Sequence, residues 1–96
     1  MPAPVQTVVS NRITTEQMER RIHRVTYHRL PGTSLTICCM VLDNGWIATG
    51  ESACVDPGNY DQFVGERLAY HKAFGTLWPL FGFMLAEDRF RKERGL

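Results

Sequence analysis

The segment from Ser34 to Leu42 (SLTICCMVL) constrains the fold more than any other part of the chain. It is short, rich in β-forming side chains, and bounded by the turn-forming groups Pro31-Gly32-Thr33 and Asp43-Asn44-Gly45, which predicts a β-strand. Side chains alternate along a strand, so one face carries Leu35, Ile37, Cys39 and Val41 and the other carries Cys38, Met40 and Leu42. Both faces are apolar, and each therefore needs a cover.

Two further β-rich segments flank this strand, Val25 to Leu30 before it and Trp46 to Thr49 after it. The dipeptide Asn44-Gly45 between β-rich runs is typical of a type I′ turn, in which both central residues have φ above zero. The sequence therefore predicts a three-stranded antiparallel meander.

Helices are predicted on both sides of the meander. Thr14 as N-cap and Gln17 three residues later form a capping box at the start of ITTEQMERRIHR, a short amphipathic N-terminal helix. Asn59 and Gln62 predict a long helix that begins near Tyr60, and Pro79 is expected to break it before a final helix to Arg94. The large apolar residues of the long helix recur with the period of a core-facing stripe, namely Tyr60, Phe63, Val64, Leu68, Phe74, Leu77 and Trp78.

A chain of 96 residues has room for one domain, so we expect an α+β domain over residues 13–96, preceded by a flexible arm over residues 1–12. The second apolar face of the central strand favours a homo-oligomer, and so does the surplus apolar surface of the last helix. The predicted interface residues are Phe83 and Phe90 on the last helix and Arg20 and Arg24 near the N-terminus.

Charge is distributed unevenly, although the formal net charge is only +1. Residues 12–29 carry five arginines against two glutamates, residues 30–88 two cations against seven acids, and residues 89–94 four cations against one acid. Two basic ends suit an anionic ligand or the acidic surface of a neighbouring subunit, while a solvated helix face is the simpler explanation. The central acids disfavour a nucleic-acid track.

Several side chains combine aromatic stacking faces with the fork-shaped donors of arginine, a combination that suits a nucleotide or phosphate. Tyr27 and Arg29 lie on the first predicted strand, Arg67 on the long helix and Arg89 on the last helix. With Asn59, these residues form the predicted ligand-binding set.

Catalysis, metal binding and membrane insertion find little support. The three cysteines are odd in number and lack metal-ligand spacing, so we expect Cys38 and Cys39 to pack in the core of a cytosolic protein that has no disulfide, metal or cofactor. Cys54 with His71 and either Asp56 or Asp61 is the one nucleophile and base combination available, which makes a small cysteine enzyme the least favoured alternative. No signal peptide is evident, and the longest uncharged run, residues 73–86, is too short to span a bilayer.

Three segments in succession carry a family resemblance: Asn44-Gly45-Trp46, GESACVDPGNYD from Gly50 to Asp61, and WPLFGFML from Trp78 to Leu85. Together they resemble a family of small tailed-phage proteins, the phage gene-product-forty-nine family, across residues 14–90. Trp46 and Phe81 depart from the residues that are usual there. The resemblance implies a phage or prophage accessory protein in the cytoplasm of a bacterial host, and it brings no catalytic residues.

Small accessory proteins of this kind need only to bind. The preferred hypothesis is a non-enzymatic, homo-oligomeric anti-defence protein that sequesters a small cyclic or modified nucleotide signal. The main alternative is a module that inhibits a bacterial host protein, with the basic surface of Arg20, Arg21 and Arg24 on an acidic partner.

Overall fold

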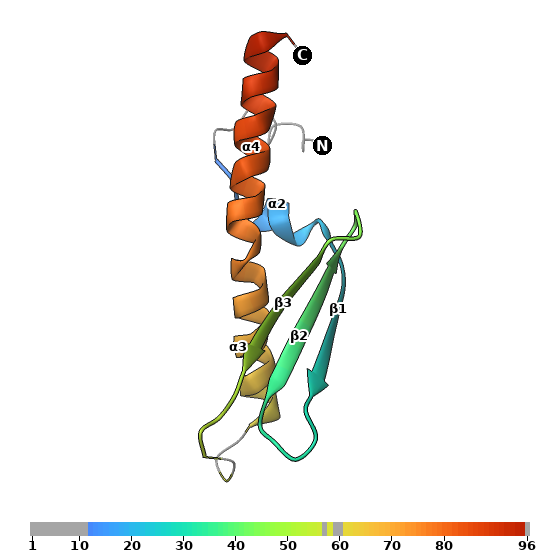
Figure 1. Cartoon of the computed structure of the whole chain (residues 1–96), viewed down its shortest axis with the longest axis vertical. Coiled ribbons are helices and arrows are strands. Elements are labelled where there is room, and N and C mark those ends of the chain that lie inside the picture. Colours follow the sequence, from blue (N-terminus) through green and yellow to red (C-terminus); the bar gives the residue numbers. More distant parts are fainter. Residues whose placement is uncertain (1–11, 57, 59–60, 96) are drawn as a thin grey trace.

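A computed structural model describes residues 12–56, 58 and 61–95 of the chain. The predicted α+β class is confirmed, with a three-stranded antiparallel sheet and helices before and after it (Figure 1). The elements in chain order are α2 (Thr15–Glu19), β1 (Ile22–Arg29), β2 (Thr36–Leu42), β3 (Ile47–Ser52), α3 (Gln62–Gly75) and α4 (Leu77–Arg94).

The short helix α2 begins where the capping box predicts. The Thr14 hydroxyl accepts a hydrogen bond from the Gln17 amide at 3.2 Å, and the Gln17 side chain accepts one from the Thr14 amide at 3.1 Å. The helix is shorter than predicted and ends at Glu19, because pairing with β2 draws the chain into strand geometry from Ile22 onward. Its one buried residue, Met18, joins the hydrophobic core.

The predicted meander is confirmed, with strand order β1-β2-β3 and both pairings antiparallel. The predicted type I′ turn is wrong, because such a turn needs positive φ at both Asn44 and Gly45. Gly45 has φ of 92°, but no residue other than glycine has positive φ in the described part of the chain. The Gly45 amide bonds to the Leu42 carbonyl at 3.0 Å, and Trp46 accepts from the Leu42 amide at 2.8 Å. One glycine thus supplies the only left-handed residue that this hairpin uses.

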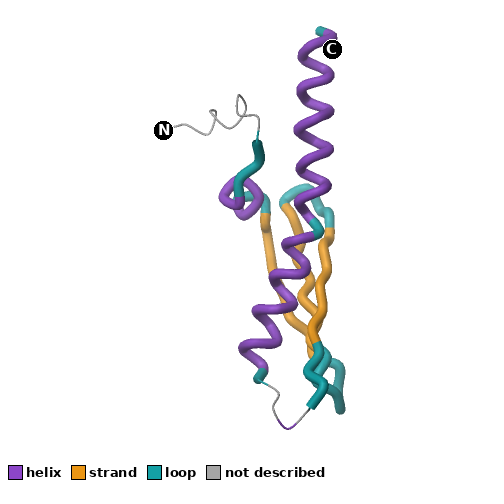
Figure 2. The backbone as a smooth tube through the Cα atoms, turned by 90° about the vertical axis from the view of Figure 1, so that its left-hand side faces the viewer, coloured by secondary structure: helices purple, strands orange, loops and turns teal. Residues whose placement is uncertain are grey.

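Helix α3 packs on one face of the sheet, against β2 and β3 (Figure 2). The contact is close at Gly50, where an added Cβ would lie less than 3.0 Å from backbone atoms of Ala69, Lys72 and Ala73. The helix meets the sheet through the small residues Gly65, Ala69 and Ala73, all buried. The Ser52 hydroxyl adds a buried hydrogen bond of 2.6 Å to the Gly65 carbonyl.

The predicted core-facing stripe of α3 is therefore wrong for its largest members. Phe74 and Leu77 are buried as expected, but Phe63 is 66% exposed, and Val64, Leu68 and Trp78 are exposed as well. A helix that lies this close to a sheet can place only small side chains in the contact, and the bulky residues lie outside it. This leaves apolar surface on the outside of the helix.

Both predicted limits of the long helix need correction. Its N-cap is Asp61, whose carboxylate accepts from the Phe63 amide at 2.9 Å, while Asn59 and Tyr60 lie outside the described residues. The interruption between helices lies at Thr76, where the hydroxyl bonds to the Ala73 carbonyl at 2.7 Å, and the break at Pro79 is not confirmed. Pro79 is the third residue of α4, in the first turn, where an amide has no intrahelical acceptor to lose.

Helix α4 continues past the sheet and gives the molecule its elongated shape, with extents of 57 × 27 × 20 Å (Figure 1). Leu77 and Phe81 anchor its first turns in the core. Every residue from Ala86 to Gly95 is exposed. The outer half of α4 is therefore an arm with no cover from the described part of the chain.

Candidate functional site

Two predicted ligand residues lie together on β1. Tyr27 and Arg29 are two residues apart and share the face of the sheet on which α3 packs. Arg29 donates from Nε to the Thr33 carbonyl at 2.9 Å, which directs its guanidinium toward the β1–β2 turn. Both side chains remain exposed, because α3 covers β2 and β3 rather than β1.

The phenol of Tyr27 stays protonated at neutral pH and can act as a hydrogen-bond donor. Burial raises the pKa of Tyr27 above its usual value of 10.0, and nearby Cys38, Glu66 and Tyr70 raise it further. Glu66 and Tyr70 belong to α3, so Tyr27 lies at the boundary between β1 and this helix. Tyr70 continues into an aromatic series, with Phe74 stacked on it at 6.0 Å and Trp78 edge-on to Phe74 at 6.3 Å.

Arg67 and Arg89 are far apart. Arg67 lies on α3 with its guanidinium carbon 5.8 Å from the centre of the exposed Phe63 ring. Arg89 lies on the arm of α4, near Phe90, which Arg94 covers at 4.9 Å. Twenty-two residues at a rise of 1.5 Å separate the two arginines by about 30 Å along the helices, more than one small nucleotide spans. Arg67 and Arg89 can contact the same small ligand only if they come from different copies.

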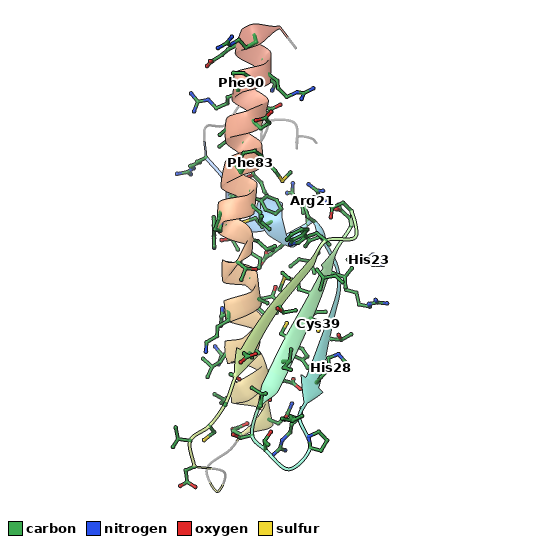
Figure 3. All side chains as sticks on the ribbon, in the orientation of Figure 1. Arg21, His23, His28, Cys39, Phe83 and Phe90 are labelled. Carbon is green, nitrogen blue, oxygen red and sulfur yellow. The ribbon has the colours of Figure 1, made fainter. Side chains whose placement is uncertain are left out.

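The predicted interface residues are all exposed. Phe83 and Phe90 lie on α4 at and beyond the end of the sheet (Figure 3), with exposed fractions of 67% and 45%. Arg20 lines a hollow of about 410 Å³ between α2 and α4, opposite Met84 and Asp88. Arg24 lies elsewhere, on the sheet face away from α3, beside Val41.

The three cysteines are free thiols in different surroundings. Cys38 is buried as predicted, whereas Cys39 is half-buried on the opposite face of the sheet. Cys54 lines a hollow of about 320 Å³ with Asp61 and donates from Sγ to the Asp56 carbonyl at 3.0 Å. His71 is not in that lining and instead meets Tyr70 edge-on from the exposed side of α3. In the same described ranges, no three His, Cys, Asp or Glu side chains gather as metal ligands.

The sequence did not single out Trp46 or Ile47, which the structure leaves exposed. It placed Phe63, Val64, Leu68 and Trp78 in the core, and these four are exposed as well. The signal that could have found them is Gly50 in the middle of a strand, since a glycine there often marks a close backbone approach. Such a close approach leaves room only for small side chains, so α3 packs in the core through Gly65, Ala69 and Ala73.

Arg21 connects three parts of the molecule. Its Nε donates to both carboxylate oxygens of Asp43 at 2.8 and 2.7 Å, its carbonyl accepts from the Asp43 amide at 2.8 Å, and its guanidinium lies 6.0 Å from the Phe81 ring centre. The residue thus joins the start of β1 to the β2–β3 hairpin and to α4.

Replacing Arg21 is expected to return the Asp43 carboxyl to normal titration. The hydrogen bond from Arg21 holds the pKa of Asp43 below its ordinary value of 3.8. The pairing therefore stabilises the fold at pH values well above this ordinary pKa, and the contribution is lost as pH falls through the lower native pKa. In Arg21→Gln, carboxyl NMR titration should show a raised pKa for Asp43, and an unchanged value would contradict this account. Arg20→Gln is the control, because Arg20 makes no such bond.

A helix-backed antiparallel sheet with a protruding helical arm defines a small α+β protein. The chain belongs to the phage protein (N4 Gp49/phage Sf6 gene 66) family, whose sequence model matches residues 13–88. No curated protein and no solved structure matches the chain. No helix in the described ranges is long and apolar enough to cross a membrane.

Proposed function

We propose that this phage protein is a non-enzymatic accessory factor that acts in the cytoplasm of a bacterial host, where it forms a homo-oligomer and captures a small cyclic or modified nucleotide signal of host defence. The observation that carries the proposal is the placement of exposed arginines on exposed aromatic rings, Arg67 on Phe63 and Arg94 on Phe90. Guanidinium groups bind phosphates through paired donors, and aromatic rings stack on bases.

The separation of Arg67 from Arg89 supports an oligomeric site. About 30 Å of helix lies between them, so a ligand that contacts both must sit between copies. The exposed apolar residues of α3 and α4 supply surface for such contacts. Tyr27 and Arg29 at the β1 boundary of α3 would then belong to the same composite site as Arg67, with Arg89 contributed by another copy.

Substitution of either helix arginine is expected to weaken ligand binding by about tenfold or more, which corresponds to the loss of one charge-assisted hydrogen bond. Native mass spectrometry with cyclic di-AMP, cyclic di-GMP and a small-molecule extract of phage-infected, defence-bearing cells detects the ligand and the subunit number together. Arg67→Ala and Arg89→Ala are then compared by titration with the ligand found, and Lys72→Ala, an exposed cation on α3, is the control. Unchanged affinity in both arginine variants would remove these assignments. A protein that gains no discrete mass would remove the nucleotide hypothesis.

A second candidate function, inhibition of a host protein, is favoured by the hollow between α2 and α4. Arg20 and Arg21 line one side of it, and Phe81 and Met84 line the other, which suits an acidic partner with an apolar side chain. If no nucleotide mass is gained, a host-lysate pull-down that loses its captured protein upon Arg20→Glu would support this candidate.

A further inference from the structure

The sheet face opposite α3 has no cover in the described part of the chain. Because Cys38, Met40 and Leu42 point to the helix, their neighbours Ile37, Cys39 and Val41 point to the open side. All three are only half-buried, and Ile47 beside Val41 is 58% exposed. None of the described helices packs on this face (Figures 1 and 2).

The pairing register arranges this face in three rows across the strands. Each row contains one residue from β1, one from β2 and one from β3. The rows are Arg24–Val41–Ile47, Thr26–Cys39–Thr49 and His28–Ile37–Glu51. Thr26 Oγ1 and His28 Nε2 lie 3.1 Å apart, which shows that these two side chains project to the same side. Figure 3 places Cys39 and His28 along the sheet, away from the arm.

A second copy of the chain matches this pattern in one orientation. If a two-fold axis runs parallel to β2 between two facing sheets, β1 of each copy lies over β3 of the other and the rows keep their level. His28 then faces Glu51, Thr26 faces Thr49, and the apolar residues of β2 face their own equivalents. The stem of Arg24 covers Ile47, which agrees with the tendency of arginine to lay its methylenes on apolar surface.

The other face-to-face two-fold, with its axis perpendicular to the strands, gives a poor match. It would set β1 against β1, so that His28 meets Arg24 and Glu51 meets the apolar Ile47. The first arrangement avoids both conflicts, and charge complementarity of this kind fixes the orientation of an interface. Of these two axes, the pattern is complementary to itself only about the one parallel to β2.

We propose that the open sheet face packs against the same face of a second copy around a two-fold axis parallel to β2, with His28 of each copy beside Glu51 of the other. The result is a β-sandwich dimer with α3 on each outer side. It is one of the contacts of the oligomer that the proposed function needs, but it rests on the sheet alone. Phe90 on the arm takes no part in this sheet contact.

A charge exchange tests the contact in the full chain. His28 and Glu51 lie on opposite edges of one sheet, about 10 Å apart with Ile37 between them, so they form no pair within a copy. His28→Glu and Glu51→Lys should each raise the dissociation constant at this contact by at least about tenfold, because like charges or a lost pair then face each other. The double variant His28→Glu/Glu51→Lys should regain the wild-type mass in sedimentation equilibrium. His71→Glu, an exposed histidine on α3, should leave the mass unchanged.

Thiol alkylation of Cys39 gives an independent readout in a Cys54→Ser background, where Cys38 is buried. We expect Cys39 to be protected in the wild-type assembly and in the double variant, and reactive in both single variants. Three results would each overturn the proposal. The single variants could keep the wild-type mass, the double variant could fail to regain that mass, or Cys39 could react equally in all of them. Thermal melts of each variant separate loss of contact from loss of fold. If the variants keep the wild-type oligomeric mass and still gain the mass of a nucleotide, that result would contradict the sheet contact but not the proposed function.

Discussion

Gly50→Ala is expected to destabilise the fold by about 3 kcal/mol, at the upper end of the range for overpacking a close contact. The added methyl group would meet backbone atoms of Ala69, Lys72 and Ala73, which no rotamer change can move aside. Helix α3 would have to withdraw from β3, and the buried bond from Ser52 to the Gly65 carbonyl would lengthen with it. Urea unfolding followed by circular dichroism measures the loss.

Gly82→Ala is the matched control for this experiment. A Cβ at Gly82 meets nothing within 4 Å, and the residue lies inside α4, where alanine is favoured over glycine by about 1 kcal/mol. The same substitution should therefore have opposite signs at the two positions. If both variants unfold at the same urea concentration, the close helix–sheet contact is not what constrains Gly50.

Met18→Ala is expected to cost about 3 kcal/mol, within the usual range for truncating a fully buried methionine. Met18 has no exposed surface, and it joins a core cluster that includes Leu77 and Phe81 of α4. It is the one buried residue of a five-residue helix, so no other side chain of α2 can replace its contacts.

Glu19→Ala is the matched control, because it introduces the same alanine at the neighbouring helix position without removing a buried side chain. Glu19 is the next residue of the same helix and is exposed, so its removal should change the free energy of unfolding by less than about 0.5 kcal/mol. Equal effects in thermal or urea unfolding would mean that α2 is not anchored by Met18. Circular dichroism at 222 nm reports whether the rest of the fold survives.

The features that could be predicted from sequence are those decided locally. The capping box at Thr14 uses atoms three residues apart, and the meander follows from β-rich runs between turn residues. Pro79 and Asn44-Gly45 do not take the roles that are commonest for them. Pro79 lies in the first turn of α4, where it is tolerated, and Gly45 alone takes the left-handed conformation.

The face of α3 could not be predicted in the same way. Periodicity identified a helix with large apolar residues at regular steps, but it could not show that Gly50 brings the sheet too close for them. Gly65, Ala69 and Ala73 form the contact between α3 and the sheet, and Phe63 and Leu68 are exposed outside it. The geometry of the candidate site could not be predicted either. Residue types indicated a ligand, but the distance between Arg67 and Arg89 depends on the lengths of α3 and α4.

The exposed arm of α4 has an energetic consequence. A helical segment of nine residues is marginal by itself in water. This one is supported by the Asp88–Lys92 pair at 3.0 Å, by Arg94 above Phe90, and by Gly95 in the left-handed conformation at its end. Its outer turns therefore fray more readily than the turns anchored by Leu77 and Phe81. Binding of a partner to Phe90 would also order those turns, and the conformational entropy lost in ordering them would weaken the binding. The affinity of such a partner therefore depends on how much of the arm is already helical.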